Sequence, residues 1–109
     1  MDVLFRTVLI KFNEDVSEDS RKKIYDMMQT LDKDCGGREA GVLFWKVDHN
    51  FNPKKCDLVE VAIFENDDAL QRFRGHPKHK KFTNVLSEIA DWWVGDICVD
   101  LPNECIKLI

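Results

Sequence analysis

The sequence has no long apolar run, since no stretch approaches the roughly 20 consecutive apolar residues that a membrane-spanning helix needs. Asp2 and Arg6 interrupt the short apolar run at the start, so no signal peptide is indicated either. We therefore expect a cytoplasmic protein with no membrane partner. Internal repeats, low-complexity segments and linkers are also missing, and 109 residues fit one globular domain.

Several motifs that carry chemistry are absent. There is no C-x-x-C pair, so neither a zinc knuckle nor a dithiol redox motif is indicated. There is also no glycine-rich phosphate loop, no nucleophile elbow and no evident Cys–His pairing. We expect the cysteines to be free thiols, several of them buried. They are Cys35, Cys56, Cys98 and Cys105.

Positive charge is not in excess. The net charge is −4 and the sequence pI is near 5.3. Nucleic-acid binding rests on a basic surface that neutralises phosphates, so nucleic acid is not the expected partner. The local run of Lys78, Lys80 and Lys81 is interpreted as one solvated helix face.

The apolar pattern predicts four strands and two helical regions. Strands are expected over Val3 to Phe12, Arg38 to Val47, Asp57 to Phe64 and Trp92 to Leu101. One helix should begin after Ser17 and run to about Cys35, before Gly36-Gly37. A second should begin after Asn66 and run to about Ala90, with a break or kink at His76-Pro77.

This order, β-α-β-β-α(α)-β, predicts an α+β fold of the ferredoxin-like type. It places strands one and three at the centre of a four-stranded sheet, with the helices on one face. The other face is also apolar, through residues such as Phe5, Leu9 and Val61, which predicts a homodimer that pairs sheet to sheet. We assign residues 1–101 to the barrel domain and 102–109 to a tail that could dock on the partner subunit.

The most informative segment is Phe73-x-x-His76-Pro77-x-His79-x-x-Phe82. Together with Lys11-Phe12, Val16-Ser17, Phe64-Glu65 and Trp93-x-x-Asp96, it resembles the stress-responsive dimeric α/β-barrel (Dabb) family over nearly the whole chain. The resemblance implies a ferredoxin-like protomer, a dimeric barrel and a small apolar cavity between sheet and helices. Members range from stress-induced proteins of unknown activity to a plant polyketide cyclase, so it does not imply one reaction.

The cyclase branch implies a catalytic pair, a tyrosine and the second histidine of the block. His79 occupies that histidine position, whereas the tyrosine position is Phe73, which has no hydroxyl to donate to an enolate. Arg6 stands where this branch has a histidine on its first strand. The electrostatic part of the cyclase mechanism is therefore missing.

Arg6 is the charged residue on the face that should pack against the helices. Glu60, on the equivalent face of the third strand, is the expected internal partner, and a closed Arg6–Glu60 ion pair is one interpretation. In the other, Arg6 offers its donors to a ligand carboxylate or enolate. Asp96 in the last strand could hold a structural contact or act on a ligand.

His79 is the candidate general base, and Arg6 the residue that would stabilise negative charge. His76 is expected mainly to anchor the bend at Pro77, and two histidines without a third ligand are too few for a metal site. No cofactor is indicated. The remaining candidate ligand-binding residues are Glu60, Phe73, His76, Tyr25 and Trp92.

The leading hypothesis is a homodimer that binds a small, mostly apolar molecule with an acidic or carbonyl group. Proton transfer next to a carbonyl, as in cyclase, lyase or isomerase reactions, fits His79 and Arg6. The alternative is a non-catalytic stress-associated dimer with a structural histidine block. A weaker alternative is cofactor-free oxygenation, as in related barrel families.

Overall fold

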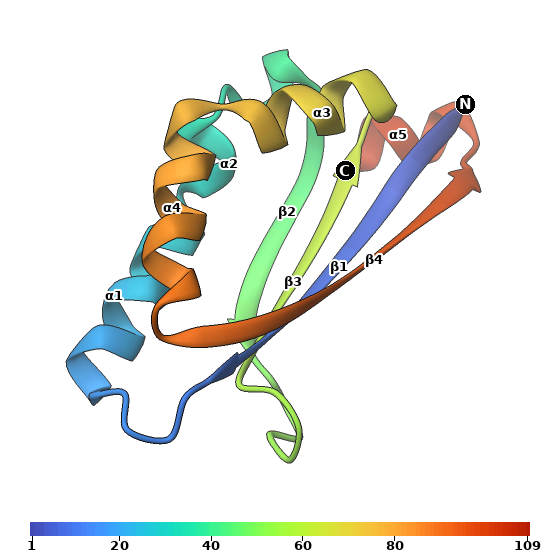
Figure 1. The fold of residues 1–109 in the computed structure, drawn as a ribbon. Helices are drawn as coiled ribbons and strands as arrows, with labels where there is room; N and C mark the ends of the chain where they lie inside the picture. Colours follow the sequence, from blue (N-terminus) through green and yellow to red (C-terminus); the bar gives the residue numbers. More distant parts are fainter.

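The computed structural model, which describes residues 1–109, is one antiparallel sheet with helices packed on one face (Figure 1). The strands lie in the order β2-β3-β1-β4, so the first and third strands are central. This confirms the predicted ferredoxin-like fold. The strands are β1 (Asp2–Phe12), β2 (Val42–His49), β3 (Leu58–Phe64) and β4 (Ala90–Asp100).

The first helical region is two helices rather than the single one predicted. α1 (Glu18–Gln29) begins as expected after Ser17, whose Oγ accepts a hydrogen bond from the backbone N–H of Ser20 at 3.1 Å. The prediction of a continuous helix to Cys35 is wrong, because the chain leaves helical geometry at Thr30 before α2 (Leu31–Asp34). Threonine has a low helix propensity, and both Leu31 and Cys35 are buried beyond the break.

A glycine fixes how closely the next segment approaches the helices. A 3₁₀ turn, η1 (Gly37–Ala40), replaces the predicted start of the second strand, and Gly41 follows it with a φ of +94°. A Cβ atom on Gly41 would lie 2.5 Å from the Cβ of Ala69. Only glycine fits both the backbone angle and this contact without displacing its neighbours.

The second helical region breaks where proline predicts it. Asn66 caps α3 (Asp67–Gly75) by accepting a hydrogen bond from the Ala69 N–H at 2.9 Å. His76 is extended, with ψ of 137°, and α4 (Pro77–Ser87) begins at the proline. The Nδ1 atom of His76 accepts a hydrogen bond from the Lys78 N–H at 3.1 Å. The helix ends at Ser87, and β4 begins at Ala90, two residues before its predicted start at Trp92.

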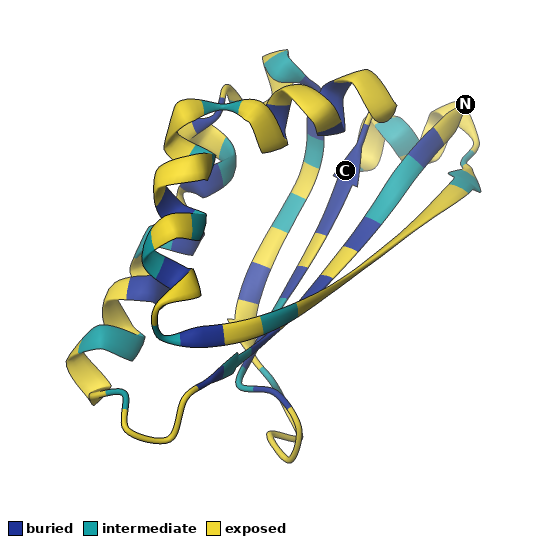
Figure 2. Ribbon diagram, in the orientation of Figure 1, coloured by how far each residue is buried: buried dark blue, intermediate teal, exposed yellow.

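The core lies between the sheet and α1, α3 and α4 (Figure 2). The face of β1 that carries Val8, Ile10 and Phe12 is buried, as the alternation of its residues predicts. Each fully buried aliphatic or phenylalanine side chain contributes about 1.5–3 kcal/mol relative to an exposed one. No helix is long and apolar enough to cross a membrane.

The opposite face of the sheet carries exposed apolar side chains. Leu9, Trp93 and Ile97 are 37%, 57% and 63% exposed. The tail forms α5 (Asn103–Leu108), which lies on the side of the sheet away from α3 and α4 (Figure 1). The Nη1 atom of Arg38 donates to the backbone oxygen of Ile109 at 2.6 Å, so the tail is held by its own chain. Docking of the tail on a partner stays a prediction.

Candidate functional site

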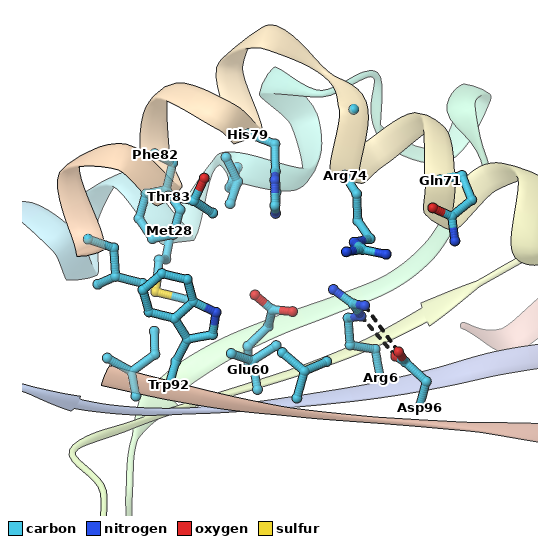
Figure 3. A pocket seen from close by; sticks show the side chains of 16 residues that line it. Arg6, Met28, Glu60, Gln71, Arg74, His79, Phe82, Thr83, Trp92 and Asp96 are labelled. Atoms are coloured by element: carbon cyan, nitrogen blue, oxygen red, sulfur yellow. Dashed lines mark hydrogen bonds and ion pairs between the residues drawn. The ribbon is translucent and has the colours of Figure 1, made fainter. Parts of the chain in front are cut away.

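A cavity of about 700 Å³ separates the sheet from α3 and α4 (Figure 3). Half of its 16 lining residues are hydrophobic. The structure brings four of the predicted site residues to this cavity, and they come from β1, β3, α4 and β4. They are Arg6, Glu60, His79 and Trp92.

The floor of the cavity consists of three successive levels of the sheet. The inward positions of β1 are two residues apart, and the levels are therefore separated by about 7 Å. Ile10 has Leu58 and Trp92 beside it, Val8 has Glu60 and Val94, and Arg6 has Ala62 and Asp96. The floor thus changes along its length from apolar, through a level with one carboxyl group, to a charged level.

The helical wall follows the same order. Phe82 and Leu86 of α4 line the apolar end, His79 lies above the level of Glu60, and Arg74 of α3 lies above Arg6 (Figure 3). The spacing of three or four residues places the α4 side chains on one face of the helix. The break at His76-Pro77 then lets α3 contribute Arg74 to the same wall. The sheet floor and the helical wall are therefore both apolar at the same end of the cavity and both charged at the other.

Arg6 is paired with Asp96 at the polar end. Its Nε donates to Oδ1 at 2.8 Å and its Nη2 donates to Oδ2 at 3.0 Å. The side chain of Arg6 is only 8% exposed, and that of Asp96 is 34% exposed. A two-point pair of this kind holds the guanidinium group in one orientation.

The closed Arg6–Glu60 pair considered from the sequence is not formed. The register of the sheet explains why, since Asp96 stands directly opposite Arg6 on β4, whereas Glu60 stands opposite Val8 on β3. Alternation along a strand predicts which residues share a face. It does not predict which of them are adjacent across the sheet.

Glu60 is buried and unpaired. The residue is 5% exposed, no group of the protein hydrogen-bonds to its carboxyl group, and that group points into the cavity (Figure 3). Burial raises the pKa of Glu60, the positive charge of Arg6 opposes this rise and the negative charge of Asp96 adds to it, and the resulting pKa is about 8. At neutral pH Glu60 is mainly a carboxylic acid, which can donate a hydrogen bond.

His79 is uncharged at neutral pH. Burial, together with the positive charges of Arg6, Arg74 and His76, lowers its pKa to about 4, against a backbone hydrogen bond to Arg74 that acts to raise it. The imidazole ring packs edge-on against Phe73, with ring centroids 4.7 Å apart. A neutral imidazole has a free nitrogen that accepts a proton, so His79 can serve as a general base.

Three predicted site residues lie outside the cavity. Phe73 is a core residue beneath His79, and His76 caps α4. Tyr25 stacks on His49, with ring centroids 4.7 Å apart and planes 9° apart, beside a separate hollow between α1 and the end of the sheet. These side chains do not line the cavity between Glu60 and His79.

Three polar lining residues were not predicted. Gln71, Arg74 and Thr83 belong to helix faces that the sequence shows only as polar and partly exposed. The signal for Thr83 was its spacing of four residues from His79, whereas Arg74 lies across the break and had none. No three His, Cys, Asp or Glu side chains come together in an arrangement that could hold a metal ion.

Comparison with known proteins agrees with this architecture. An uncharacterised protein of Streptomyces coelicolor is 26% identical over 91 residues, which cover 82% of this chain and 92% of the relative. A dimeric ferredoxin-like protein of unknown function from Thermobifida fusca superposes with a TM-score of 0.77 at 14% identity, covering 90% of this chain and 92% of the other. A hydroxynitrile lyase from Passiflora edulis superposes with a TM-score of 0.76 at 11% identity, covering 92% of this chain and 95% of the other.

At these identities the solved structures share the fold alone. The decisive comparison is with the sequence model of a family described as Stress responsive A/B Barrel Domain, which matches residues 4–102. The match spans every strand and α1 to α4. The chain therefore belongs to the stress-responsive A/B barrel domain family, as the His-Pro-x-His block predicts.

Proposed function

We propose that this protein is a homodimer that binds a small, mostly apolar molecule with a carbonyl or acidic group in the cavity. We propose further that it transfers a proton next to that group without a cofactor. The observation that carries the proposal is the neutral imidazole of His79, which faces the unpaired carboxyl group of Glu60 across a cavity with an apolar end.

His79 is the base in this proposal. It removes a proton from the carbon next to the carbonyl group, and negative charge develops on the carbonyl oxygen. Arg6 stabilises this charge through its field, which Asp96 weakens but does not abolish, since Asp96 is partly solvated.

Two observations support the remaining parts of the proposal. The exposed apolar side chains of the outer sheet face, including Trp93 and Ile97, are suited to an interface between two copies. The Thermobifida fusca protein is described as dimeric, and the Passiflora edulis protein is a lyase on the same fold. Both are consistent with a dimer in which acid–base chemistry takes place.

The test uses butyrophenone, a neutral aromatic ketone with exchangeable protons next to its carbonyl group. The protein in heavy water should accelerate loss of the α-methylene signal in proton NMR, and His79→Gln should reduce the enzymatic rate about a hundredfold. His49→Gln is the matched control, because His49 stacks on Tyr25 outside the cavity. Equal exchange rates with the wild-type and His79→Gln proteins would remove His79 as the base.

The non-catalytic alternative has one observation in its favour. The Arg6–Asp96 pair satisfies Arg6 within the protein, without a ligand. This alternative expects no exchange above the buffer rate with the wild-type protein. The same NMR experiment therefore separates the two functions.

A further inference from the structure

The polar groups of the cavity are sorted along its length, and this order restricts the ligand more than the catalytic groups alone. The apolar end is formed by Ile10 and Trp92 on the floor and by Phe82 above it. Glu60 and His79 occupy the middle level (Figure 3). Charged groups lie only at the far end.

The far end carries a net positive charge. Arg6 and Arg74 contribute two guanidinium groups, and Asp96 contributes one carboxylate. No carboxylate of the protein pairs with Arg74, which reaches over Arg6 from the end of α3 (Figure 3). One exposed cation is therefore left without a protein partner beside the cavity, where it can exchange its water for an anionic group of the ligand.

The middle level favours a different group. A largely buried carboxyl group without a partner in the protein is left to hydrogen-bond with water in the cavity or with a ligand that displaces this water. Because Glu60 is mainly protonated at neutral pH, its best partner is an acceptor such as a carbonyl oxygen. The facing groups are Arg6 from β1, Asp96 from β4, Arg74 from α3 and His79 from α4. None of them donates to or accepts from Glu60.

We propose that the ligand is an amphipathic keto acid, with its apolar end beside Trp92, its ketone oxygen on Glu60 and its carboxylate at Arg74 and Arg6. This inference rests on the proposed function and names its ligand class. Neighbouring levels of the floor are about 7 Å apart, and the flexible side chain of Arg74 spans the remainder. A ketone and a carboxylate separated by two methylene groups cover part of this spacing, and the reach of Arg74 covers the rest.

The assignment makes Glu60 a further catalytic residue. The C–H bond next to the ketone breaks, its proton goes to His79, and its electron pair forms the C=C bond of an enol. The carbonyl π electrons move to the oxygen, which takes the proton of Glu60. The products are a neutral enol, a Glu60 carboxylate and a His79 imidazolium, so charge and protons balance. Return of a proton from His79 to carbon and from the enol to Glu60 restores both groups.

Three related probes separate the contributions. The aryl keto acid β-benzoylpropionate carries both polar groups, γ-phenylbutyrate lacks the ketone, and butyrophenone lacks the carboxylate. In calorimetric titrations we expect the keto acid to bind about tenfold or more tightly than either of the others. Arg74→Gln should weaken the binding of the two carboxylate probes severalfold. Lys81→Gln makes an equal charge change on the exposed side of α4 and should leave their binding unchanged.

Glu60→Gln tests the acid. The amide keeps the shape and a hydrogen-bond donor but cannot transfer a proton, so keto-acid binding at pH 6 should persist while deuterium exchange slows about tenfold or more. Above pH 8, binding to the wild-type protein should weaken as Glu60 ionises, and binding to Glu60→Gln should not.

The ligand assignment and the proposed function fail in different ways. Two results would overturn the keto-acid assignment: equal affinity for the three probes, or binding of the carboxylate probes that Arg74→Gln does not weaken. Either result would do so even if His79-dependent exchange of butyrophenone persisted. Tight, Arg74-dependent binding of the keto acid without any exchange would refute proton transfer and leave the ligand class in place.

Discussion

Arg6 and Asp96 stand opposite each other on β1 and β4 and are joined by two hydrogen bonds of 2.8 and 3.0 Å. The pair lies at one end of the cavity, and its negative member contributes to the raised pKa of Glu60. The charge state of the site thus depends on a contact between the central strand and an edge strand.

Asp96→Asn should destabilise the protein, because it leaves the nearly buried guanidinium group of Arg6 without an anion. We expect the free energy of unfolding, measured in urea, to fall by about 1 to 3 kcal/mol. Asp100→Asn is the control, since Asp100 is 81% exposed and pairs only with the N-terminal ammonium. If the two variants were equally stable, the Arg6–Asp96 pair would have no structural importance.

The buried Glu60 should make stability depend on pH. Between pH 4.5 and about pH 8 the folded chain retains a proton on Glu60 that the unfolded chain has released. Glu60 therefore makes the free energy of unfolding fall as the pH rises. Between about 4 and 6.5 the unfolded chain holds a proton on His79 that the folded chain lacks, so His79 makes stability rise with pH. The two effects oppose each other up to pH 6.5, and above it only that of Glu60 remains.

Urea unfolding of the wild-type protein should therefore show a decrease of roughly 1 to 2 kcal/mol in the free energy of unfolding between pH 6.5 and 8. Glu60→Gln should lose this decrease, because glutamine does not ionise. A wild-type stability that stays constant or rises over this interval would mean that Glu60 is ionised in the folded protein.

The imidazole of His79 should stay uncharged until the pH approaches 4. An NMR titration of its ring protons, assigned by comparison with His79→Gln, measures this directly. The cause is burial next to the positive charges of Arg6 and Arg74, so the midpoint should lie well below the ordinary value of 6.5. A midpoint near that ordinary value would place His79 in contact with bulk water.

A charge on the outer sheet face should prevent dimerisation. Trp93→Glu or Ile97→Glu would bury a carboxylate in the proposed interface, and sedimentation equilibrium at micromolar concentration should then give the mass of one chain. Lys23→Glu on exposed α1 is the control and should remain dimeric. A monomeric wild-type protein would refute the homodimer.

Periodicity and turn chemistry predicted most of the fold. Alternation along β1 identified its inward face, and Pro77 marked the break between α3 and α4. The break at Thr30 was not predicted, because no proline or glycine marks it and its geometry depends on how Leu31 packs. Local sequence signals describe single elements, whereas this break reflects contacts between elements.

The candidate site was predicted less completely, for a related reason. Arg6 and Glu60 were identifiable because a charged residue on an apolar face is unusual, and His79 because it belongs to the His-Pro-x-His block. The Arg6–Asp96 pair depends on the sheet register, and the position of Arg74 depends on the angle between two helices. Neither quantity is determined by the pattern of any one segment.

The close approach of Gly41 to Ala69 has a consequence for the shape of the cavity. Ala69 lies in the first turn of α3, the helix that carries Gln71 and Arg74 over the polar end of the cavity. Any side chain at position 41 would collide with Ala69 and require α3 or the turn at Gly41 to shift, while every residue that lines the cavity stayed the same. The shape of the polar end of the cavity therefore depends on a backbone position that does not itself line the cavity, so a change there could alter this end while the lining residues stay the same.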